Sequence, residues 1–220
     1  MTVRVLILGA GGHAQVVADI LLRMRENGAS LAPIGYLDDN LALKGRCALE
    51  LPVMGDIAQL VEIPHEAVVV AIGNNAIRQR LFESLRHQGE HFVTAQHPRA
   101  IVAPDVDIGI GSMICAGAIV NPSSVIGANV ILNTGSTVDH HNRIGDHVHI
   151  APGAHLGGDV VIGEGALIGI GATVMPSCQI GAWSVIGAAA LVHRNVPAYV
   201  TAVGAPARVI KQRIHERGVI

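Results

Sequence analysis

Residues 102–137 read VAPDVD-IGIGSM-ICAGAI-VNPSSV-IGANVI-LNTGST, and each block of six opens with an aliphatic side chain. The spacing continues to residue 192 without a miss, and its sixteen positions are Val102, Ile108, Ile114, Val120, Ile126, Leu132, Val138, Ile144, Ile150, Leu156, Ile162, Ile168, Val174, Ile180, Ile186 and Val192. A period of six fits neither the turn of an α-helix nor the two-residue alternation of a free strand. It fits a solenoid in which each flat side of a coil takes six residues.

Two further columns of residues follow the same rhythm. The fourth residue after each aliphatic position, from Ser112 to Val196, is Ser, Ala, Val or Cys in fourteen of fifteen cases, and the exception is Asn142. Glycine directly follows the aliphatic position at 109, 127, 145, 163 and 181, which lie eighteen residues apart. Because eighteen is three blocks of six, each coil is predicted to be a triangle of three short strands. Aliphatic residues fill its inside, small residues lie beside the corners, and the glycines permit the turns.

The first hundred residues follow a different pattern. An apolar run at 3–8 leads into Gly9-Ala10-Gly11-Gly12-His13 and then into helical patterning over 14–24, which predicts a strand, a glycine turn and a helix. Further strands are predicted at 34–37 and 67–72, and a second helix from about 76 to 88. This β-α-β-β-α order with apolar strands predicts a Rossmann-like parallel sheet domain.

We therefore predict three segments along the chain. Residues 1–97 form the Rossmann-like domain and end at the junction His97-Pro98-Arg99-Ala100; residues 98–200 form a parallel β-helix; residues 201–220 form a C-terminal loop and cap. Within the last segment we expect a loop at 203–208, followed at 209–217 by a short capping helix or a terminal strand.

Composition excludes several classes of partner. The net charge is −2 and the basic residues are scattered, so neither a nucleic-acid footprint nor a membrane-binding surface is indicated. No apolar run reaches the length of a membrane span, and the first ten residues lack the apolar region of a signal peptide. The cysteines Cys47, Cys115 and Cys178 are odd in number and far apart, which is typical of a reducing compartment. We expect a cytoplasmic protein.

Three predicted strand ends suggest a ligand site in the first domain. The backbone amides of Gly11, Gly12 and His13 open a helix after a strand and are suited to a phosphate, although the full G-x-G-x-x-G pattern is absent. The next two strands end at Asp38-Asp39 and at Gly73-Asn74-Asn75. The carboxyl ends of the three strands lie at the same end of the sheet, where open α/β sheets bind ligands. The alternative is a tight turn between strand and helix that binds nothing.

A second candidate site lies inside the repeats. The block Val138-Asp139-His140-His141-Asn142-Arg143 is the most polar one and contains the exception Asn142, and local rules tend to break at functional sites. His147, His149 and His155 follow, and ordinary surface histidines are the alternative. Residues eighteen apart should stack, and no histidine stacks on another at this spacing, which argues against a metal site within one chain. The other role is general-base catalysis, with Asp139 fixing the tautomer of His140.

The order of five motifs resembles a known family. It is the group of hexapeptide-repeat acyltransferases that use acetyl-CoA and carry a Rossmann-like domain in front: the sialic-acid O-acetyltransferases and the bacillosamine or perosamine N-acetyltransferases. The motifs are Gly9-Ala10-Gly11-Gly12-His13, Leu37-Asp38-Asp39, Ala71-Ile72-Gly73-Asn74-Asn75, Asn133-Thr134-Gly135-Ser136-Thr137-Val138-Asp139-His140 and Val203-Gly204-Ala205-Pro206-Ala207-Arg208. The resemblance implies a left-handed β-helix and a homotrimer with active sites between subunits.

The resemblance also implies roles for single residues. His140 matches the general base and is preceded by Asp139; His149 matches a second histidine near the acetyl group; the backbone amide of Gly158 matches a donor to the developing oxyanion. Some relatives carry an acidic residue after the base where this chain has His141, so the base stays open between His140 and His141.

Binding residues follow from the same resemblance. Acetyl-CoA is expected in the groove between two prisms, at Gly157, Ile170, Ala188 and Arg208. The nucleotide-linked sugar is expected at Gly11, Gly12, His13, Asp38, Asp39, Gly73, Asn74 and Asn75.

The expected activity is acetyl transfer from acetyl-CoA to an amino sugar. The leading hypothesis is the C4 amine of a nucleotide-linked amino-dideoxy sugar such as GDP-perosamine, for bacterial surface polysaccharide (O-antigen), with no metal required. UDP-linked bacillosamine precursors come next. The rivals are O-acetylation of a sialic-acid-type sugar and a non-catalytic trimeric scaffold or binding module.

Overall fold

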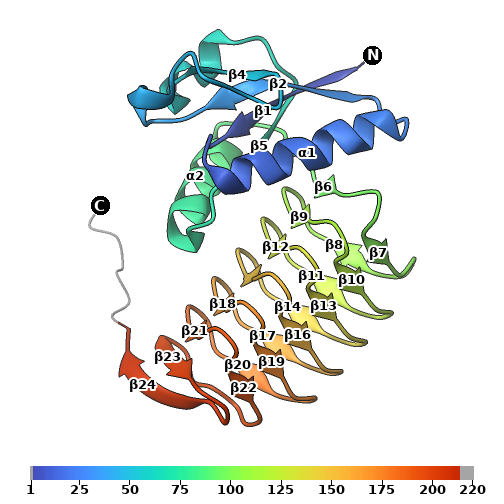
Figure 1. The fold of residues 1–220 in the computed structure, drawn as a ribbon, viewed down its shortest axis with the longest axis vertical. Coiled ribbons are helices and arrows are strands. Elements are labelled where there is room, and N and C mark those ends of the chain that lie inside the picture. Colours follow the sequence, from blue (N-terminus) through green and yellow to red (C-terminus); the bar gives the residue numbers. More distant parts are fainter. Residues whose placement is uncertain (1, 214–220) are drawn as a thin grey trace.

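The computed structural model describes residues 2–213, which form two domains placed one upon the other (Figure 1). The N-terminal domain holds a five-stranded sheet in the order β3-β4-β2-β1-β5, parallel except between β3 and β4. Its strands are β1 (Val3–Leu8), β2 (Leu31–Leu37), β3 (Cys47–Ala48), β4 (Leu51–Gly55) and β5 (Ala67–Val70). Its helices are α1 (Gly12–Glu26) and α2 (Asn75–His87), with 3-10 turns η1 (Leu41–Leu43) and η2 (Ile57–Glu62).

Strand β1, which lies between β2 and β5, explains why two helices cover this sheet. Val5 and Ile7 pack in the cluster of α1, whereas Leu6 and Leu8 pack with Phe82 of α2. Alternate residues of a strand point to opposite faces, so a run that is apolar throughout needs a cover on both sides. The Rossmann-like prediction is therefore confirmed.

The details of this domain differ from the predicted elements in three places. Strand β2 begins at Leu31, three residues earlier than expected, and β5 ends at Val70, two residues earlier. The hairpin β3–β4 was not predicted, because its strands are short and β4 contains Pro52. Proline is common in strands at or near a sheet edge, where a missing N–H costs little.

Residues 95–212 form a triangular prism with three ladders of short strands, which we call faces 1, 2 and 3 (Figure 1). Face 1 consists of β7 (Ile101–Val102), β10 (Ile119–Val120), β13 (Thr137–Val138), β16 (His155–Leu156), β19 (Thr173–Val174) and β22 (Leu191–Val192). Face 2 consists of β8 (Asp107–Ile108), β11 (Val125–Ile126), β14 (Arg143–Ile144), β17 (Val161–Ile162) and β20 (Gln179–Ile180). Face 3 consists of β6 (Ala95–Gln96), β9 (Met113–Ile114), β12 (Ile131–Leu132), β15 (His149–Ile150), β18 (Leu167–Ile168), β21 (Val185–Ile186), β23 (Val200–Val203) and β24 (Arg208–Gln212).

The register between coils is eighteen residues, as the sequence predicts. Ile119 pairs with Thr137 and Thr137 with His155, and the other faces keep the same step. From Ile114 to Val192 every aliphatic position of the repeat is buried, and so is every small corner residue. This inside column of Ile, Leu and Val is the core of the prism, and its burial supplies the main driving force for coil stacking.

The corner glycines act differently from the prediction. The left-handed backbone is absent from all five glycines that follow an aliphatic position, Gly109, Gly127, Gly145, Gly163 and Gly181. Instead, a Cβ atom at any of them would collide with the next coil. The left-handed conformation occurs two residues later in each corner, where His141 has a φ of 57° and His147 a φ of 60°. The glycines are thus required by close packing of coils, and residue types other than glycine carry many of the turns.

Both ends of the prism extend face 3. Strand β6 pairs with β9, so the first ladder strand lies just before the expected junction at His97. At the other end β23 pairs with β21, and β24 folds back antiparallel to β23. The C-terminal alternatives thus resolve to a strand for Arg208–Gln212, while the rest of the segment expected there, 214–217, lies outside the described residues.

The N-terminal domain rests on face 3. The outward side chains Ala95, Met113 and Ile131 are fully buried in the cluster of α1. A helix that covers part of a β-helix face needs such apolar outward residues, since both surfaces leave water. Within residues 2–213 no helix has the length and apolar character that crossing a membrane requires.

Candidate active site

The glycine turn between β1 and α1 presents free backbone amides. Gly9 has a φ of 106°, and its N–H donates to the Leu37 carbonyl at 2.8 Å. Helix α1 has Gly11 as its N-cap, with no side chain capping the first turn, and a Cβ at Gly11 or Gly12 would meet open space. The first N–H groups of α1 therefore face outward and are suited to an anion.

The polar residues at the neighbouring strand ends hold their own loops. Asp38 accepts hydrogen bonds from the N–H of Ala10 at 2.7 Å and of Asn40 at 2.8 Å, which ties the glycine turn to β2. Asp39 accepts from the N–H of Ile57 at 3.1 Å, and Asn74 caps α2 by accepting from Ile77 at 3.1 Å. These side chains follow the carboxyl ends of neighbouring strands, as predicted, and each accepts a hydrogen bond from a backbone N–H of its own domain.

Asn75 differs from its neighbours because it turns toward the prism. Its Nδ2 donates to the carbonyls of Gly165 and Ala166, at 3.0 and 3.1 Å. We predicted it as a sugar ligand, and the structure places it in the contact between the two domains.

Two histidines from different domains meet at this contact. The rings of His13 and His149 lie with centroids 6.3 Å apart. Asn133 Nδ2 donates to Nε2 of His149 at 3.1 Å, and the backbone of Gly73 hydrogen-bonds the same ring. Because an amide N–H only donates, the proton of the neutral His149 ring lies on Nδ1. We call Gly11, Gly12, His13, Gly73 and His149 the glycine-turn cluster.

Burial keeps both imidazoles neutral. Burial is the main cause that lowers the pKa of His13 to about 4 and the pKa of His149 to about 3, and the nearby Arg78 guanidinium contributes to both shifts. Nε2 of His13 is buried and has no hydrogen-bond partner within the described chain. A buried polar atom without a partner is costly, so this nitrogen is the open position of the cluster.

A buried arginine, which the sequence did not reveal, locks the domains together. Arg78 of α2 is fully buried and donates to the carbonyls of Ile72, Asn129 and His147, at 3.1, 3.1 and 2.7 Å. Burial lowers its pKa to about 9. His147, which we grouped with the candidate base, instead lies in this contact with its Nε2 3.3 Å from Glu83. An arginine on an otherwise apolar helix face was the available signal.

The second candidate site lies on the prism corner that joins face 1 to face 2, which we call edge 1–2. The ring of His140 lies against Gly158 of the next coil, where any Cβ atom would overlap it. The N–H of Gly158 makes no hydrogen bond within residues 2–213. A free N–H beside an imidazole is the arrangement expected for a base next to an oxyanion donor.

The partner of the His140 ring is not the predicted one. Nδ1 of His140 lies 2.9 Å from Nδ1 of His141. The carboxylate of Asp139 instead accepts from Asn121 Nδ2 and from the backbone N–H of His140, both at 2.8 Å. The bond from Asn121 is the largest cause that lowers the pKa of Asp139. We call Asp139, His140, His141 and Gly158 the edge cluster.

Asn142, the exception in the small-residue column, has a structural role in this corner. Its buried Nδ2 donates to the carbonyls of Asp139 and Gly157, the latter at 2.9 Å. Ser112, Ser124 and Ser184 make the same kind of bond to a carbonyl in the next coil on the same edge. The exception therefore fixes the backbone that carries His140 and does not itself face the site.

The two clusters lie on opposite sides of one prism. His149 belongs to face 3, whereas His140 lies on edge 1–2, the corner that face 3 does not touch. The expected coenzyme residues are divided in the same way. Gly157 lies on edge 1–2, whereas Ile170 and Ala188 are exposed on edge 3–1, the corner between faces 3 and 1, and Arg208 begins β24. One subunit therefore does not bring these residues together.

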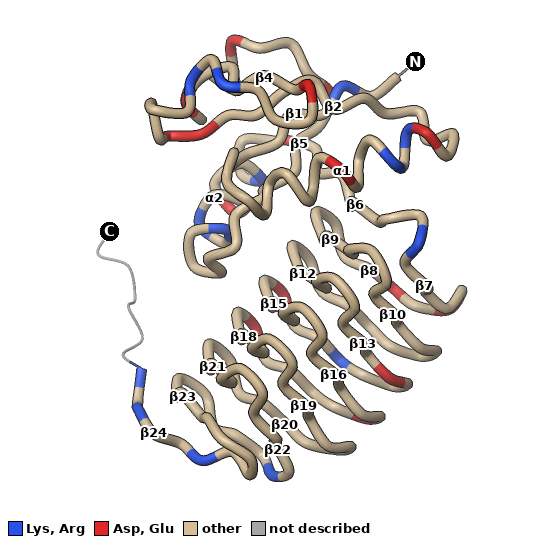
Figure 2. The backbone as a smooth tube through the Cα atoms, in the orientation of Figure 1, with Lys and Arg blue, Asp and Glu red and all other residues tan. Residues whose placement is uncertain are grey.

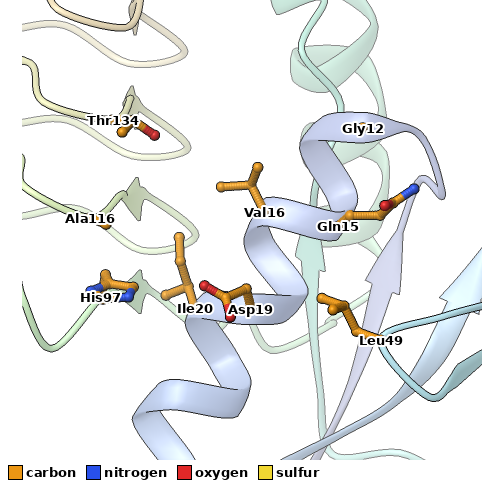
Figure 3. A pocket seen from close by; sticks show the side chains of 9 residues that line it. All are labelled: Gly12, Gln15, Val16, Asp19, Ile20, Leu49, His97, Ala116 and Thr134. Carbon is orange, nitrogen blue, oxygen red and sulfur yellow. The ribbon is translucent and has the colours of Figure 1, made fainter.

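A pocket of about 400 Å³ lies between α1 and edge 3–1 (Figure 3). It begins at Gly12 and is lined by Val16, Asp19, His97 and Thr134, among others. An acidic side chain faces it and no lysine or arginine does, so this pocket is unsuited to a phosphate. Basic residues are spread along the chain, with Arg208, Lys211 and Arg213 close together at β24 (Figure 2).

The described residues offer neither a reactive buried cysteine nor a group of metal ligands. Cys115 and Cys178 are buried, and burial raises the pKa of Cys115 to about 12 and also raises the pKa of Cys178. Neither thiol is thus suited to a covalent step. Among residues 2–213 no three His, Cys, Asp or Glu side chains gather closely enough to bind a metal ion.

Comparison with known families matches both domains. Residues 4–85 match the family described as the PglD N-terminal domain. Residues 142–169 and 159–194 match the bacterial transferase hexapeptide family of six repeats. A curated relative from Bacillus subtilis (strain 168), UDP-N-acetylbacillosamine N-acetyltransferase, is 40% identical over 114 residues, which are 51% of each chain. The match thus spans about half the length of that relative.

Solved structures match nearly the whole chain. The acetyltransferase domain of PglB from Neisseria gonorrhoeae FA1090, in complex with acetyl coenzyme A, is 34% identical with a TM-score of 0.89, over 96% of this chain and 100% of that one. PerB from Caulobacter crescentus, in complex with CoA and GDP-perosamine, is 40% identical with a TM-score of 0.85, over 94% and 97%. With its PglD-type domain and its left-handed β-helix, the chain belongs to the nucleotide-sugar N-acetyltransferases of the hexapeptide-repeat superfamily.

Proposed function

We propose that this protein transfers the acetyl group of acetyl-CoA to the amine of a nucleotide-linked amino-dideoxy sugar. The C4 amine is the expected acceptor and GDP-perosamine the leading candidate, in the synthesis of a bacterial surface polysaccharide in the cytoplasm. The observation that carries the proposal is the placement of an imidazole, His140, against the free N–H of Gly158 on a prism edge. The 40% identity to a protein solved with CoA and GDP-perosamine supports the choice of substrates.

The edge cluster supplies the groups that direct acetyl transfer needs. The neutral amine attacks the thioester carbonyl carbon, and the new C–N bond forms as the carbonyl oxygen gains negative charge. The N–H of Gly158 donates to this oxygen, and Nε2 of His140 accepts the proton that the amine loses. The C–S bond then breaks, CoA leaves as a thiolate, and the proton that His140 accepted is released to it, which restores the base. No step requires a cysteine or a metal.

The glycine-turn cluster supplies the sugar site. Phosphates of the nucleotide bind the free amides of Gly11 and Gly12, where the positive end of α1 favours an anion. The sugar then approaches the unpartnered Nε2 of His13, beside His149. His149 itself is held by Asn133 and Gly73, so its role is to fix the position of His13 and of the substrate.

A complete site requires two subunits of a trimer. The glycine-turn cluster lies where the N-terminal domain meets face 3, and the edge cluster is on edge 1–2 of the same prism, so only a neighbouring copy brings edge 1–2 to face 3. Three identical prisms around a threefold axis repeat this contact three times. Acetyl-CoA then lies along the groove between Gly157 of one subunit and Ile170 and Ala188 of the next, with Arg208 close to its phosphates.

Ligand binding provides the first test. Thermal unfolding is measured with acetyl-CoA and with a panel of UDP-, dTDP- and GDP-linked amino sugars. A ligand at about one hundred times its Kd stabilises by roughly 2.7 kcal/mol, which corresponds to several degrees for a chain of this size. Acetyl-CoA and one nucleotide sugar should each raise the Tm. Binding of acetyl-CoA with no nucleotide sugar would favour O-acetylation of a free sugar, and no binding at all would favour a scaffold.

Turnover tests the base. His140→Asn should lose at least about 10²-fold in kcat, as is typical when a general base is removed, with little change in Tm. Near-normal turnover of His140→Asn would remove His140 from this role and leave His141 as the candidate.

A further inference from the structure

The edge cluster contains two adjacent imidazoles in direct contact. Nδ1 of His140 and Nδ1 of His141 lie 2.9 Å apart, and the rings meet edge to face with centroids 5.1 Å apart at an angle of 82°. Two ring nitrogens at this distance need one proton between them, because two lone pairs or two N–H groups would repel each other. The contact therefore joins the tautomer of one ring to that of the other.

Three hydrogen bonds and one backbone conformation hold this pair. The N–H of His140 donates to Asp139 Oδ1 at 2.8 Å, and the carbonyl of His140 accepts from the N–H of Asp159 at 3.0 Å. The N–H of His141 donates to the Pro122 carbonyl at 3.1 Å, and His141 adopts the left-handed conformation that this corner requires. The two side chains thus leave a rigid turn in set directions.

The shared proton has two positions, and only one leaves His140 able to act as a base. If His141 holds the proton on Nδ1, the neutral His140 carries its own proton on Nε2 and has no lone pair for the substrate amine. If His140 holds it on Nδ1, its Nε2 is free and lies beside Gly158. After proton transfer the His140 imidazolium carries a proton on both nitrogens, so Nδ1 must then donate to His141.

We infer that His141 is a positioning residue for the acetyl transfer: its Nδ1 accepts the Nδ1–H of His140 and thereby holds Nε2 of His140 unprotonated toward the acceptor amine. This inference rests on the proposed role of His140 as the base. Asp139 does not take this part, since its carboxylate accepts from Asn121 and from the backbone N–H of His140, whereas the ring Nδ1 of His140 lies against His141. The acceptor is an imidazole and not a carboxylate.

Three substitutions at residue 141 separate this role from a structural one. His141→Asn keeps an acceptor oxygen at a similar reach and suits the left-handed backbone. His141→Ala and His141→Gly remove the acceptor, and glycine does so with no strain in this conformation. The matched control is Ser123→Ala, because Ser123 lies in the preceding coil on the same edge and also has a left-handed backbone.

The first readout is the tautomer of His140, measured by ¹⁵N NMR of the imidazoles in the intact histidine-labelled protein, with the signal assigned through His140→Asn. Wild type and His141→Asn should show His140 protonated at Nδ1. His141→Gly should shift the ring toward the form protonated at Nε2. An unchanged tautomer in both His141→Gly and His141→Ala would overturn the inference, and this result needs no knowledge of the substrate.

The second readout is turnover with acetyl-CoA and the amino sugar that binds. Both His141→Ala and His141→Gly should lose about 10- to 100-fold in kcat with KM for acetyl-CoA almost unchanged, since a misplaced tautomer affects only the chemical step. His141→Asn should restore most of the rate, and Ser123→Ala should match wild type. If His140→Asn abolishes turnover while His141→Ala and His141→Gly remain fully active, this inference alone fails. If His140→Asn remains active, the proposed base fails first.

Discussion

At the scale of single residues, Gly158 shows how the absence of one side chain makes room for another. The ring of His140 occupies the space that a Cβ at position 158 would take. The fourth position of each corner is small for packing reasons, but Gly158 lies at the second position, where the other corners of the same edge carry Pro104, Pro122, His140, Pro176 and Arg194. Its small size is therefore explained by the imidazole of the preceding coil, which needs the space, and by its backbone N–H, which stays accessible.

Gly158→Ala tests this contact. Its methyl group should displace the His140 ring and lower kcat by about 10- to 100-fold, because a misplacement of about 1 Å in a catalytic group has an effect of this size. The Tm should fall little, since His140 is exposed and its ring can swing into water. Gly153→Ala, at a left-handed corner with open space around it, controls for loss of a glycine. Full activity of Gly158→Ala would contradict the assigned position of the His140 ring.

At the scale of secondary-structure elements, two contacts fix the N-terminal domain on the prism. Helix α1 meets β15 through His13 and His149, and α2 meets the corner between faces 2 and 3 through Asn75 and Arg78. Both contacts bury groups that prefer water: two neutral imidazoles and a guanidinium with carbonyl partners only. Such contacts are specific because each lost partner leaves a buried polar atom unsatisfied.

Acid should weaken the contact between α1 and β15. The pKa of His13 is lowered to about 4 and the pKa of His149 to about 3, whereas an unfolded histidine titrates near 6.5. Between these values the unfolded chain binds more protons than the folded one, so stability is full above about pH 6.5 and declines as pH falls. Two such groups give a slope on the order of 2–3 kcal/mol per pH unit.

The slope is measured by urea unfolding between pH 7 and pH 4.5. The double variant with His13→Gln and His149→Gln should show a distinctly flatter decline than wild type. His87→Gln, a change on the exposed end of α2, serves as the control and should keep the wild-type slope. Equal slopes for the double variant and wild type would mean that these two imidazoles are not buried neutral.

The contact of α2 depends on Arg78. Arg78→Met should lower the free energy of unfolding by roughly 2–4 kcal/mol, because it leaves several buried carbonyls without donors. Arg78→Lys should recover only part of this loss, since one ammonium does not reach all three carbonyls. Arg80→Met, on the exposed side of the same helix, should stay close to wild type in denaturant unfolding. A loss for Arg80→Met as large as that for Arg78→Met would argue against a specific lock.

At the scale of the whole molecule, the prism separates the two halves of the proposed site. Face 3 carries the docked domain and His149, while His140 lies on the opposite edge. A triangular cross-section makes this separation unavoidable within one chain. It also makes a ring of three prisms an arrangement in which every edge 1–2 meets a face 3.

Mixed trimers test this arrangement. His140→Asn and His149→Asn should each lose most of the activity alone, but together they should regain activity. In randomly mixed trimers about one quarter of the sites combine an intact glycine-turn cluster with an intact edge cluster from the next subunit, so activity should approach this fraction. The measurement is turnover after co-expression, with each single variant as the baseline. Activity no higher than the baselines would place both histidines in a site within one subunit.

The sequence by itself determined the prism, its eighteen-residue coil, the Rossmann-like domain and the family, because these depend on periodicity and on local motifs that tolerate few alternatives. The family resemblance added His149 and left the base open between His140 and His141. Only the tertiary structure decided which residues meet. The ring of His140 contacts that of His141, and Asn75 and His147 lie in the contact between the two domains. Arg78 is buried in the same contact and donates to the His147 carbonyl. The physical reason is that a sixfold rhythm specifies which side chains point inward, whereas the partners of outward side chains depend on how two domains, far apart in the sequence, are packed together.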